Sequence, residues 1–441
     1  MTRQVLVAGG ALLGAGLLLC AVGVHASDTP WPEASGSQAN TSNSAAATVV
    51  TPITLADALQ RSLEQNPQLA IYASEVQASI AEVAQTKRYR NPELSLEIEN
   101  VAGSGDFSGT DAAEITLQLS QQLEWHDKRR QRIASSELRR QGAELDDRIA
   151  RAALLATTKQ RFYDLLAAQQ RLALANNQAD HADRLLATVE ERIAAGKVAD
   201  IERLRFEPLR LEAQLHREQA DLELTGARLA LAALWGGQTA DLLEADGSLE
   251  QLPELPDWAD ITALSEHSPR LSRQTIETDR AAQEFRRQQV ERYPDLALNI
   301  GGRRFEETGD QALIAGLSIS LPVFDRNRDA IAAARARDAG ARSALRAARL
   351  QTETDLRQLW QTLQAAHAEA TLLETRLLPI AQTRFDAVVY GYRAGKYDAL
   401  DLLAAEQALY SSRQRHIDTL QTFHRILADL EEMLGRGIDK S

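Results

Sequence analysis

Histidine is the residue type in this sequence best suited to metal coordination or general-base chemistry, and its spacing supports neither. The sequence holds eight histidines, and those after residue 26 are His126, His181, His216, His267, His367, His416 and His424. No two of them have the H-x-x-x-H spacing that puts two ligands on one helix face. We expect each to be a solvated or interface histidine, and no metal site is predicted.

Other patterns that could carry chemistry are equally weak. The segment GSGDFSG (103–109) is glycine-rich like a phosphate-binding loop. It joins two expected strands, however, whereas a phosphate loop joins a strand to a helix. We therefore expect an external loop there. A G-x-S-x-G nucleophile pattern does not occur, and the sequence predicts no enzyme, no catalytic residue and no cofactor.

Composition predicts a mostly helical protein. The apolar share of 44% can supply a sizeable core, and the aromatic share is only 5%. Ala, Leu, Glu, Gln and Arg dominate long tracts that contain few Pro or Gly, which is typical of extended helices. The net charge of −13 makes nucleic acid an unfavourable partner.

The N-terminal residues resemble an export signal. Residues 1–26 carry one charge, then an uncharged run, then the small-residue pattern Val24-His25-Ala26. A transmembrane anchor is the alternative interpretation of the uncharged run. Cys20 follows Leu19, where a lipoprotein signal needs a small residue, so lipidation is not expected. Removal of the signal also removes the single cysteine and with it thiol chemistry. Residues 27–52 are small and polar, and we expect a flexible arm.

The rest of the chain is a tandem duplication. Ordered blocks match at an offset of about 200 residues, which predicts one repeat at 53–240 and another at 260–436. The matching pairs are Pro67 and Pro269, Pro92 and Pro294, Asp127 and Asp325, Gly196 and Gly395, and Gly236 and Gly435.

Each repeat contains two stretches of strict apolar–polar alternation, which predicts strands. The expected strands are at about 93–100 and 114–123 in the first repeat, and at about 295–301 and 313–321 in the second. Their pattern suits a sheet with its apolar face outward and its polar face inward. The prolines before them stop the preceding helices.

Four strands from one chain cannot close a membrane sheet, because lipid leaves open edges without partners. Two chains would supply eight strands and three chains twelve, and twelve leave an open polar lumen. A soluble sheet with one wet face fits the alternation equally well. Export, the aromatics Trp125 and Phe324 at the helix-proximal strand ends, and the lack of any other expected sheet favour the barrel.

The helices are predicted to be very long. Residues 127–195 contain no proline, so a continuous helix there would reach about 100 Å. The returning chain supplies two shorter helices of similar total length. Apolar positions at steps of 3, 4 or 7 give a narrow seam, and a free-standing coiled coil would leave the strands unexplained. Each long helix must reverse at a glycine, at Gly196-Lys197 and at Gly395-Lys396.

At these residues the chain resembles the TolC family of outer-membrane efflux proteins, over residues 53–436. The segments NPELSLEIEN, LSQQLEWHDKR and RFEETGDQALIAGLSISLPVFDRNR resemble its heavy-metal, CzcC-like branch. His126-Asp127 departs from the glycine-containing pair usual in that branch, and Ser320 replaces a usual proline.

The resemblance implies a homotrimer with a twelve-stranded outer-membrane barrel, continued by a helical periplasmic tunnel. It also implies a periplasmic adaptor and a proton-driven inner-membrane pump of the resistance-nodulation-division type as partners. The function implied is export of divalent cations such as cobalt, zinc and cadmium. A duct for drugs or secreted proteins is the alternative, and a periplasmic adaptor is a weaker one, because adaptors have one helical hairpin and compact β domains.

The resemblance also assigns roles to residues. The tips around Gly196, Lys197, Gly395 and Lys396 are expected to dock the adaptor. An aspartate six residues after the second tip glycine narrows the entrance in the family, and Asp401 matches it. The related position in the first repeat is Glu202, and the family's second aspartate is Ala404 here.

Near the strands, Lys128, Arg129 and Arg130 crowd the start of the first long helix, where the helix dipole disfavours cations. Together with Trp125 and Phe324 they are candidates for the membrane interface, where the cations would meet lipid phosphates. A solvated cluster is the alternative.

Overall fold

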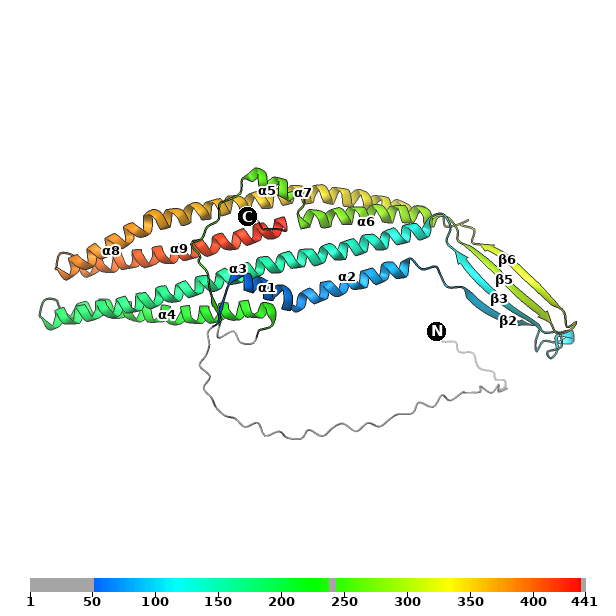
Figure 1. Cartoon of the computed structure of the whole chain (residues 1–441), viewed down its shortest axis with the longest axis horizontal. Coiled ribbons are helices and arrows are strands. Elements are labelled where there is room, and N and C mark those ends of the chain that lie inside the picture. Colours follow the sequence, from blue (N-terminus) through cyan, green and yellow to red (C-terminus); the bar gives the residue numbers. More distant parts are fainter. Residues whose placement is uncertain (1–50, 238–242, 438–441) are drawn as a thin grey trace, which may run out of the picture. The chain divides into compact units, whose positions relative to one another are not determined.

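The computed structural model describes residues 51–237 and 243–437. The expected export signal and the arm up to residue 50 lie outside this part, as does the predicted end of the first repeat at residue 240. Within it, the two repeats follow one plan of helix, two strands, long helix and returning helix (Figure 1). The duplication expected from the sequence is therefore visible as a repeated order of elements.

The helices and strands have the following bounds. The α-helices are α1 (Leu55–Gln65), α2 (Pro67–Thr86), α3 (Lys128–Ala194), α4 (Arg203–Ala232), α5 (Trp258–Ser265), α6 (Pro269–Glu291), α7 (Arg328–Leu372), α8 (Leu378–Arg393) and α9 (Ala399–Leu434). The strands are β1 (Thr51–Ile53), β2 (Glu93–Glu99), β3 (Glu114–Leu123), β4 (Leu243–Ala245), β5 (Leu296–Phe305) and β6 (Gln311–Ile319).

The helix that precedes the strands begins in the same way in each repeat. Asn66 caps α2, and its side chain accepts a hydrogen bond from the backbone N–H of Gln68 at 2.8 Å. Ser268 caps α6 and accepts from the N–H of Leu271 at 3.4 Å. Proline follows each cap at the first helical position, where its missing N–H costs nothing. Pro67 and Pro269, which the alignment paired, therefore begin equivalent helices.

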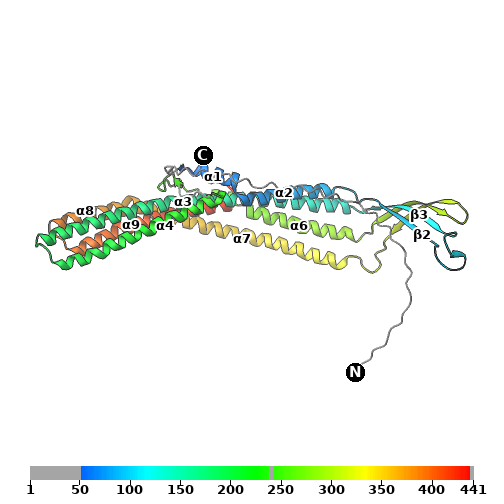
Figure 2. The same ribbon diagram turned by 90° about the horizontal axis from the view of Figure 1, so that it is seen from below.

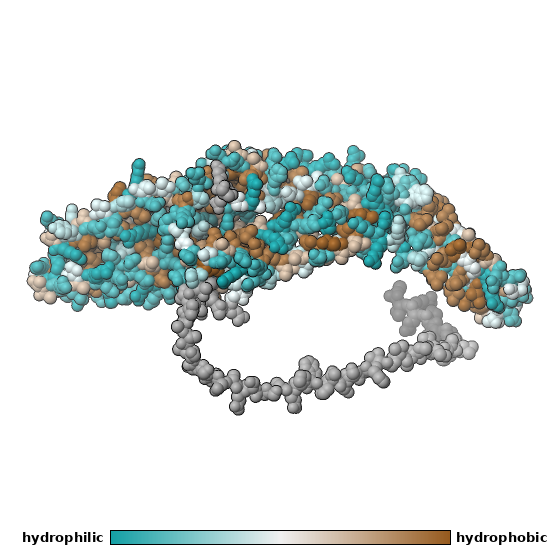
Figure 3. All heavy atoms as spheres, viewed as in Figure 1, coloured by the Kyte–Doolittle hydropathy of each residue, from teal (hydrophilic) through white to brown (hydrophobic). Residues whose placement is uncertain are grey.

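The four long strands form one antiparallel sheet in the order β2-β3-β5-β6. The two repeats join in its middle, where Leu119 of β3 lies opposite Ile300 of β5. Leu94 of β2 lies on the other side of Leu119, and all three side chains are exposed. Figure 3 shows this apolar surface as a brown band over the strands. A soluble sheet would cover its apolar face, so the exposure favours the membrane interpretation.

The strands of the second repeat differ from the prediction. The sequence predicted 295–301, but β5 continues to Phe305. Gly301 and Gly302 remain paired with β3, but they have no side chains and so interrupt the apolar–polar alternation from which the strand was predicted. The return strand was predicted at 313–321, but β6 covers Gln311–Ile319. The predicted strands of the first repeat, 93–100 and 114–123, agree with β2 and β3 within one residue.

A second sheet corrects the expectation that there would be none. Strands β1 and β4 pair in parallel, with Pro52 opposite Glu244. Each has only three residues, too few for a periodic signal, and they lie about 190 residues apart. The membrane interpretation of the long strands therefore rests on their exposed apolar face.

The long helices run side by side (Figure 2). Helix α3 has 67 residues and packs against α4, α2, α6 and α9. Its partner in the second repeat is interrupted, because a π-helical turn at Leu373–Leu377 separates α7 from α8. Pro379 follows this turn and cannot donate a backbone hydrogen bond, which accounts for the local irregularity.

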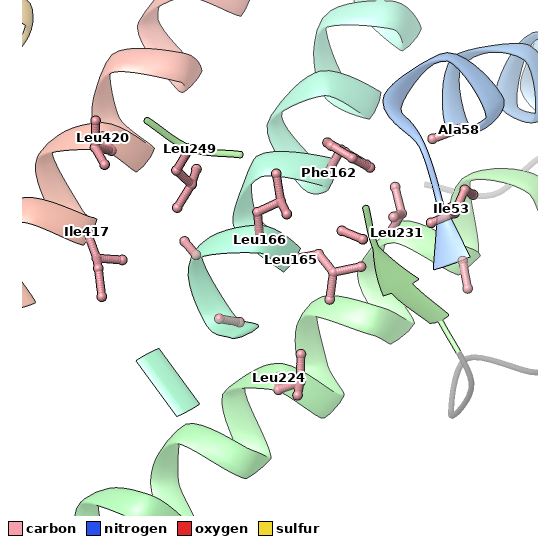
Figure 4. Packing of buried hydrophobic residues seen from close by; sticks show 14 of the residues in the cluster. Ile53, Ala58, Phe162, Leu165, Leu166, Leu224, Leu231, Leu249, Ile417 and Leu420 are labelled. Atoms are coloured by element: carbon pink, nitrogen blue, oxygen red, sulfur yellow. The ribbon is translucent and has the colours of Figure 1, made fainter. Parts of the chain in front are cut away.

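The largest core cluster joins α3, α4 and α9 (Figure 4). Phe162 and Leu165 of α3 meet Leu231 of α4 and Leu420 of α9, and each is at most 2% exposed. Burying a side chain of this size contributes about 1.5–3 kcal/mol. In the part of the chain that the structure describes, no helix is long and apolar enough to cross a bilayer.

Candidate functional site

The first tip reverses the chain through a Schellman turn at Gly196. The N–H of Gly196 donates to the carbonyl of Ile193 at 2.9 Å, and that of Lys197 donates to Arg192 at 2.9 Å. Gly196 has φ +67°, a conformation that favours glycine. A 3₁₀ turn, Asp200–Glu202, then leads into α4. Lys197 is exposed at the end of the hairpin.

The second tip has the same turn and a different exit. Lys396 donates from its backbone to the carbonyl of Gly391 at 2.8 Å, and Gly395 has φ +72°. Helix α9 then begins with a capping box, in which the N–H of Asp401 donates to the side chain of Asp398 at 2.9 Å. Lys396 is exposed like Lys197. The structure thus places both Gly-Lys pairs at the tips, while their role in docking stays a prediction.

One side chain ties the two tips together. Arg192 of α3 donates through Nη1 to the carbonyl of Tyr392 at 2.7 Å, and its guanidinium lies 4.7 Å from the centroid of the Tyr392 ring. Burial raises the pKa of the Tyr392 hydroxyl. Sequence analysis missed this contact, because Arg192 aligns with Gly391 and so has no counterpart in the other repeat. This difference between the two repeats is the signal in the sequence that could have revealed the contact.

The two aperture candidates have different surroundings. Asp401 is exposed in the first turn of α9, where its carboxylate takes part in the capping box. Glu202 is partly buried at the end of the 3₁₀ turn and pairs with Arg205 at 2.8 Å. Asp401 therefore keeps a negative charge open to solvent, while Arg205 neutralises that of Glu202.

Some candidates for the membrane interface are exposed, and others contact residues of the same chain. Phe324 is fully exposed and Trp125 is about half exposed. Lys128 is 9% exposed and binds Asp295 at 2.8 Å. Arg129 donates to the carbonyl of Lys87 and lies over the ring of Tyr89. Arg130 is 74% exposed and pairs with Asp127 at 3.2 Å. Trp125, Phe324 and Arg130 are therefore exposed as the prediction requires, whereas Lys128 and Arg129 bind residues of the same chain.

The arrangement offers little for chemistry. Among residues 51–237 and 243–437, no group of three or more His, Cys, Asp or Glu side chains could hold a metal ion. The glycine-rich segment 103–109 connects β2 to β3 as expected and contains the short 3₁₀ turn Gly105–Phe107. What the geometry does offer is a passive surface: an apolar sheet at one end of the helices and two exposed tips at the other (Figure 1).

Comparison with known proteins identifies related sequences. The family described as "Outer membrane efflux protein" matches residues 58–237 and 261–436. The cobalt-zinc-cadmium resistance protein CzcC of Cupriavidus metallidurans is 30% identical over 385 residues, which cover 87% of this chain and 90% of that protein. The nickel-cobalt-cadmium resistance protein NccC of Alcaligenes xylosoxydans xylosoxydans is 30% identical over 66% of each chain.

A solved structure shares the fold. The outer membrane protein VceC of Vibrio cholerae superposes with a TM-score of 0.75, covering 87% of this chain and 97% of that one. The sequence identity is 18%, so this likeness establishes the architecture alone.

Proposed function

The chain belongs to the outer membrane efflux protein family, and from this membership we propose that it is the outer-membrane channel of an efflux system for divalent heavy-metal cations. The observation that carries the substrate class is the similarity over nearly the full length to a cobalt-zinc-cadmium resistance protein. The lack of a three-ligand cluster among the described residues suits this role, because a conduit must release the ions that enter it.

The channel is proposed to be a homotrimer with a twelve-stranded barrel. The four-stranded sheet has two outer strands, β2 and β6, with an unpaired edge each. Such edges need partners in lipid, and β6 of one copy pairing with β2 of the next would close the ring. Twelve strands leave room for a polar lumen, toward which Ser95 and Glu97 would point.

A stripe of exposed leucines supports the same assembly. Helix α4 carries leucines at steps of 7 and 4 that are each more than half exposed, a spacing that forms one face of a helix. They are Leu204, Leu211, Leu215, Leu222 and Leu229. An uncovered apolar stripe of this length favours a neighbouring copy as its cover.

The assembly is tested by mass and by a charge on the sheet. Mass determination in mild detergent should give three copies, and a stable membrane-inserted monomer would contradict the barrel. Leu317→Arg places a charge on the exposed apolar face of β6 and should cost about 2–4 kcal/mol in the membrane. Ser318→Arg, on the opposite face, is the matched control and should insert normally.

The partners are proposed to be a periplasmic adaptor, bound at the two tips, and a proton-driven inner-membrane pump. The tips suit docking because Lys197 and Lys396 are exposed there, farthest along the helices from the strands (Figure 1). In a trimer, three copies of Asp401 would surround the axis at this end and form an aperture, with Glu202 beside it.

The function is tested by deleting the gene and complementing it on a plasmid. Deletion should sensitise cells to zinc, cobalt or cadmium and raise the metal content of the cells, and the wild-type gene should restore both. Sensitivity only to drugs, or loss of a secreted protein, would instead assign the chain to a different branch of the family.

A further inference from the structure

Glu406 lies in the apolar core of the second hairpin without a partner. Its side chain is 1% exposed, and both carboxylate oxygens are buried without a hydrogen-bond partner. Among the described residues, it is the acidic side chain for which both oxygens are in this state. An isolated carboxylate in such a place is costly, because nothing replaces its water.

The position of Glu406 on α9 is a core position. Leu402, Leu409 and Tyr410 lie four residues before, three after and four after it, which puts all four on one helix face. Each of these neighbours is buried. The apolar cluster around them joins α9 to Val189 of α3, Phe206 of α4 and Phe385 of α8. Glu406 therefore lies on the face of α9 that packs against the first hairpin and α8.

Three charged groups lie near Tyr410, the neighbour of Glu406 on α9. Burial raises the pKa of the Tyr410 hydroxyl, one turn from Glu406, and after the charge of Glu406 the next contributions come from Arg413 of α9 and from Arg184 and Asp180 of α3. Arg413 donates to Gln382 of α8 at 2.6 Å, and Gln382 in turn donates to Asp386 of the same helix at 2.9 Å. None of them bonds Glu406.

Other ionisable groups of α3, α4 and α8 form no bond with the carboxyl of Glu406 either. Tyr392 of α8 belongs to the same apolar cluster, and its buried hydroxyl has no partner. Arg210 of α4 has a buried Nε atom without a partner, and it forms no ion pair with Glu406. His181 of α3 packs edge-on against Phe385 and Tyr410. Burial, followed by Arg184 and Arg413, lowers the pKa of His181, so this histidine is neutral near pH 7.

We propose that Glu406 is a proton-sensitive latch between the two hairpins: the protonated carboxyl packs in the core, and its ionisation loosens the contact of α9 with α3, α4 and α8. The latch is a property of this chain's packing and does not depend on what the channel carries. In the proposed channel, it would make the tip end respond to the pH around it.

The direction of the effect follows from linkage. Burial raises the pKa of Glu406 from 4.5 to about 7. A raised carboxyl pKa means that the packed state holds the proton more tightly than the loosened state does. The stabilisation of the packed state is full below about pH 4.5 and is lost as the pH rises to about 7. The loosened population should therefore grow with pH, by roughly tenfold between pH 6 and 8.

Hydrogen–deuterium exchange of the full-length protein in detergent tests the latch. Amides at 381–392 and 399–409, corrected for intrinsic exchange, should open roughly tenfold more at pH 8 than at pH 6. Glu406→Gln mimics the protonated group and should remove this dependence. The matched control is Glu207→Gln, because Glu207 lies 199 residues earlier, at the equivalent position of α4, and is exposed. It should behave like the wild type.

A second variant covers the case in which Gln packs poorly. Glu406→Leu fills the same space without a polar group and should also give pH-independent exchange, with a thermal midpoint above the wild type at pH 8. A wild-type protein without the extra pH dependence, or a Leu variant that keeps it, would overturn the proposal. Loss or retention of metal resistance has no bearing on this result, so the proposed function is judged separately.

Discussion

Helices α4 and α9 are equivalent elements of the two repeats, and they differ in how much of their apolar surface the chain covers. Each follows a Gly-Lys tip, and matching positions lie 199 residues apart. Helix α4 presents exposed leucines such as Leu204 and Leu211. At the equivalent positions of α9, Leu403 is partly buried and Tyr410 is 6% exposed. The two repeats therefore share the same order of helices, while α4 and α9 make different contacts.

Glu207 and Glu406 show the same divergence in one residue type. They occupy equivalent positions, and one is exposed while the other is 1% exposed. At this position the single chain leaves α4 uncovered, whereas α9 is covered by other helices of the same chain.

The largest expected effect compares core and stripe leucines. Leu402→Ala removes a side chain that is 0% exposed and should lower the free energy of unfolding by about 2–5 kcal/mol. Leu204→Ala, at a site that is 57% exposed, should change the stability of the single chain by less than about 0.5 kcal/mol. Thermal melting of the helical circular dichroism signal measures both.

Leu204→Ala should instead reduce the fraction of trimers in a mass measurement. Equal melting shifts for the two variants, with unchanged assembly, would remove the distinction between the two helices.

A smaller effect is expected at the tip glycines. Valine at Gly395 or Gly196 is forced into positive φ, which costs about 1–2 kcal/mol. The capping box holds the second tip rigidly, so Gly395→Val should distort the surface and abolish metal resistance while trimers remain. Gly196→Val should be milder, because the uncapped 3₁₀ turn after it can relax. Growth in medium that contains zinc measures resistance, and mass determination measures the fraction of trimers.

Gly226→Ala in α4 is the control, since a Cβ there meets no atom within 4 Å. Full resistance in the Gly395 variant would argue against docking at that tip.

The sequence predicted the elements whose signal is periodic or local. Alternation located β2 and β3 within one residue, and the glycines located both tips. The pairing of β1 with β4 was missed, because three-residue strands distant in the chain leave no pattern. The burial of Glu406 could not be predicted either. Its residue type and repeat position equal those of Glu207, and only packing between helices separates the two.

The smallest expected effect concerns the aperture, where Asp401 and Glu202 are again equivalent positions. If a trimer brings Asp401 carboxylates to roughly 7 Å from one another, two of them repel by about 2.4 kcal/mol at an effective dielectric near 20. Such a ring attracts cations and is strained when shut. Asp401→Asn keeps an acceptor in the capping box, so stability should fall by no more than about 0.5 kcal/mol.

Single-channel recording should then show weaker block by divalent ions for Asp401→Asn, because the exposed charge is lost. Glu202→Gln should change the trace less, since Arg205 already neutralises that carboxylate at 2.8 Å. An unchanged trace for Asp401→Asn would remove this residue from the aperture and leave it as a helix cap. A larger change for Glu202→Gln would reverse the comparison and assign the entrance to the first hairpin.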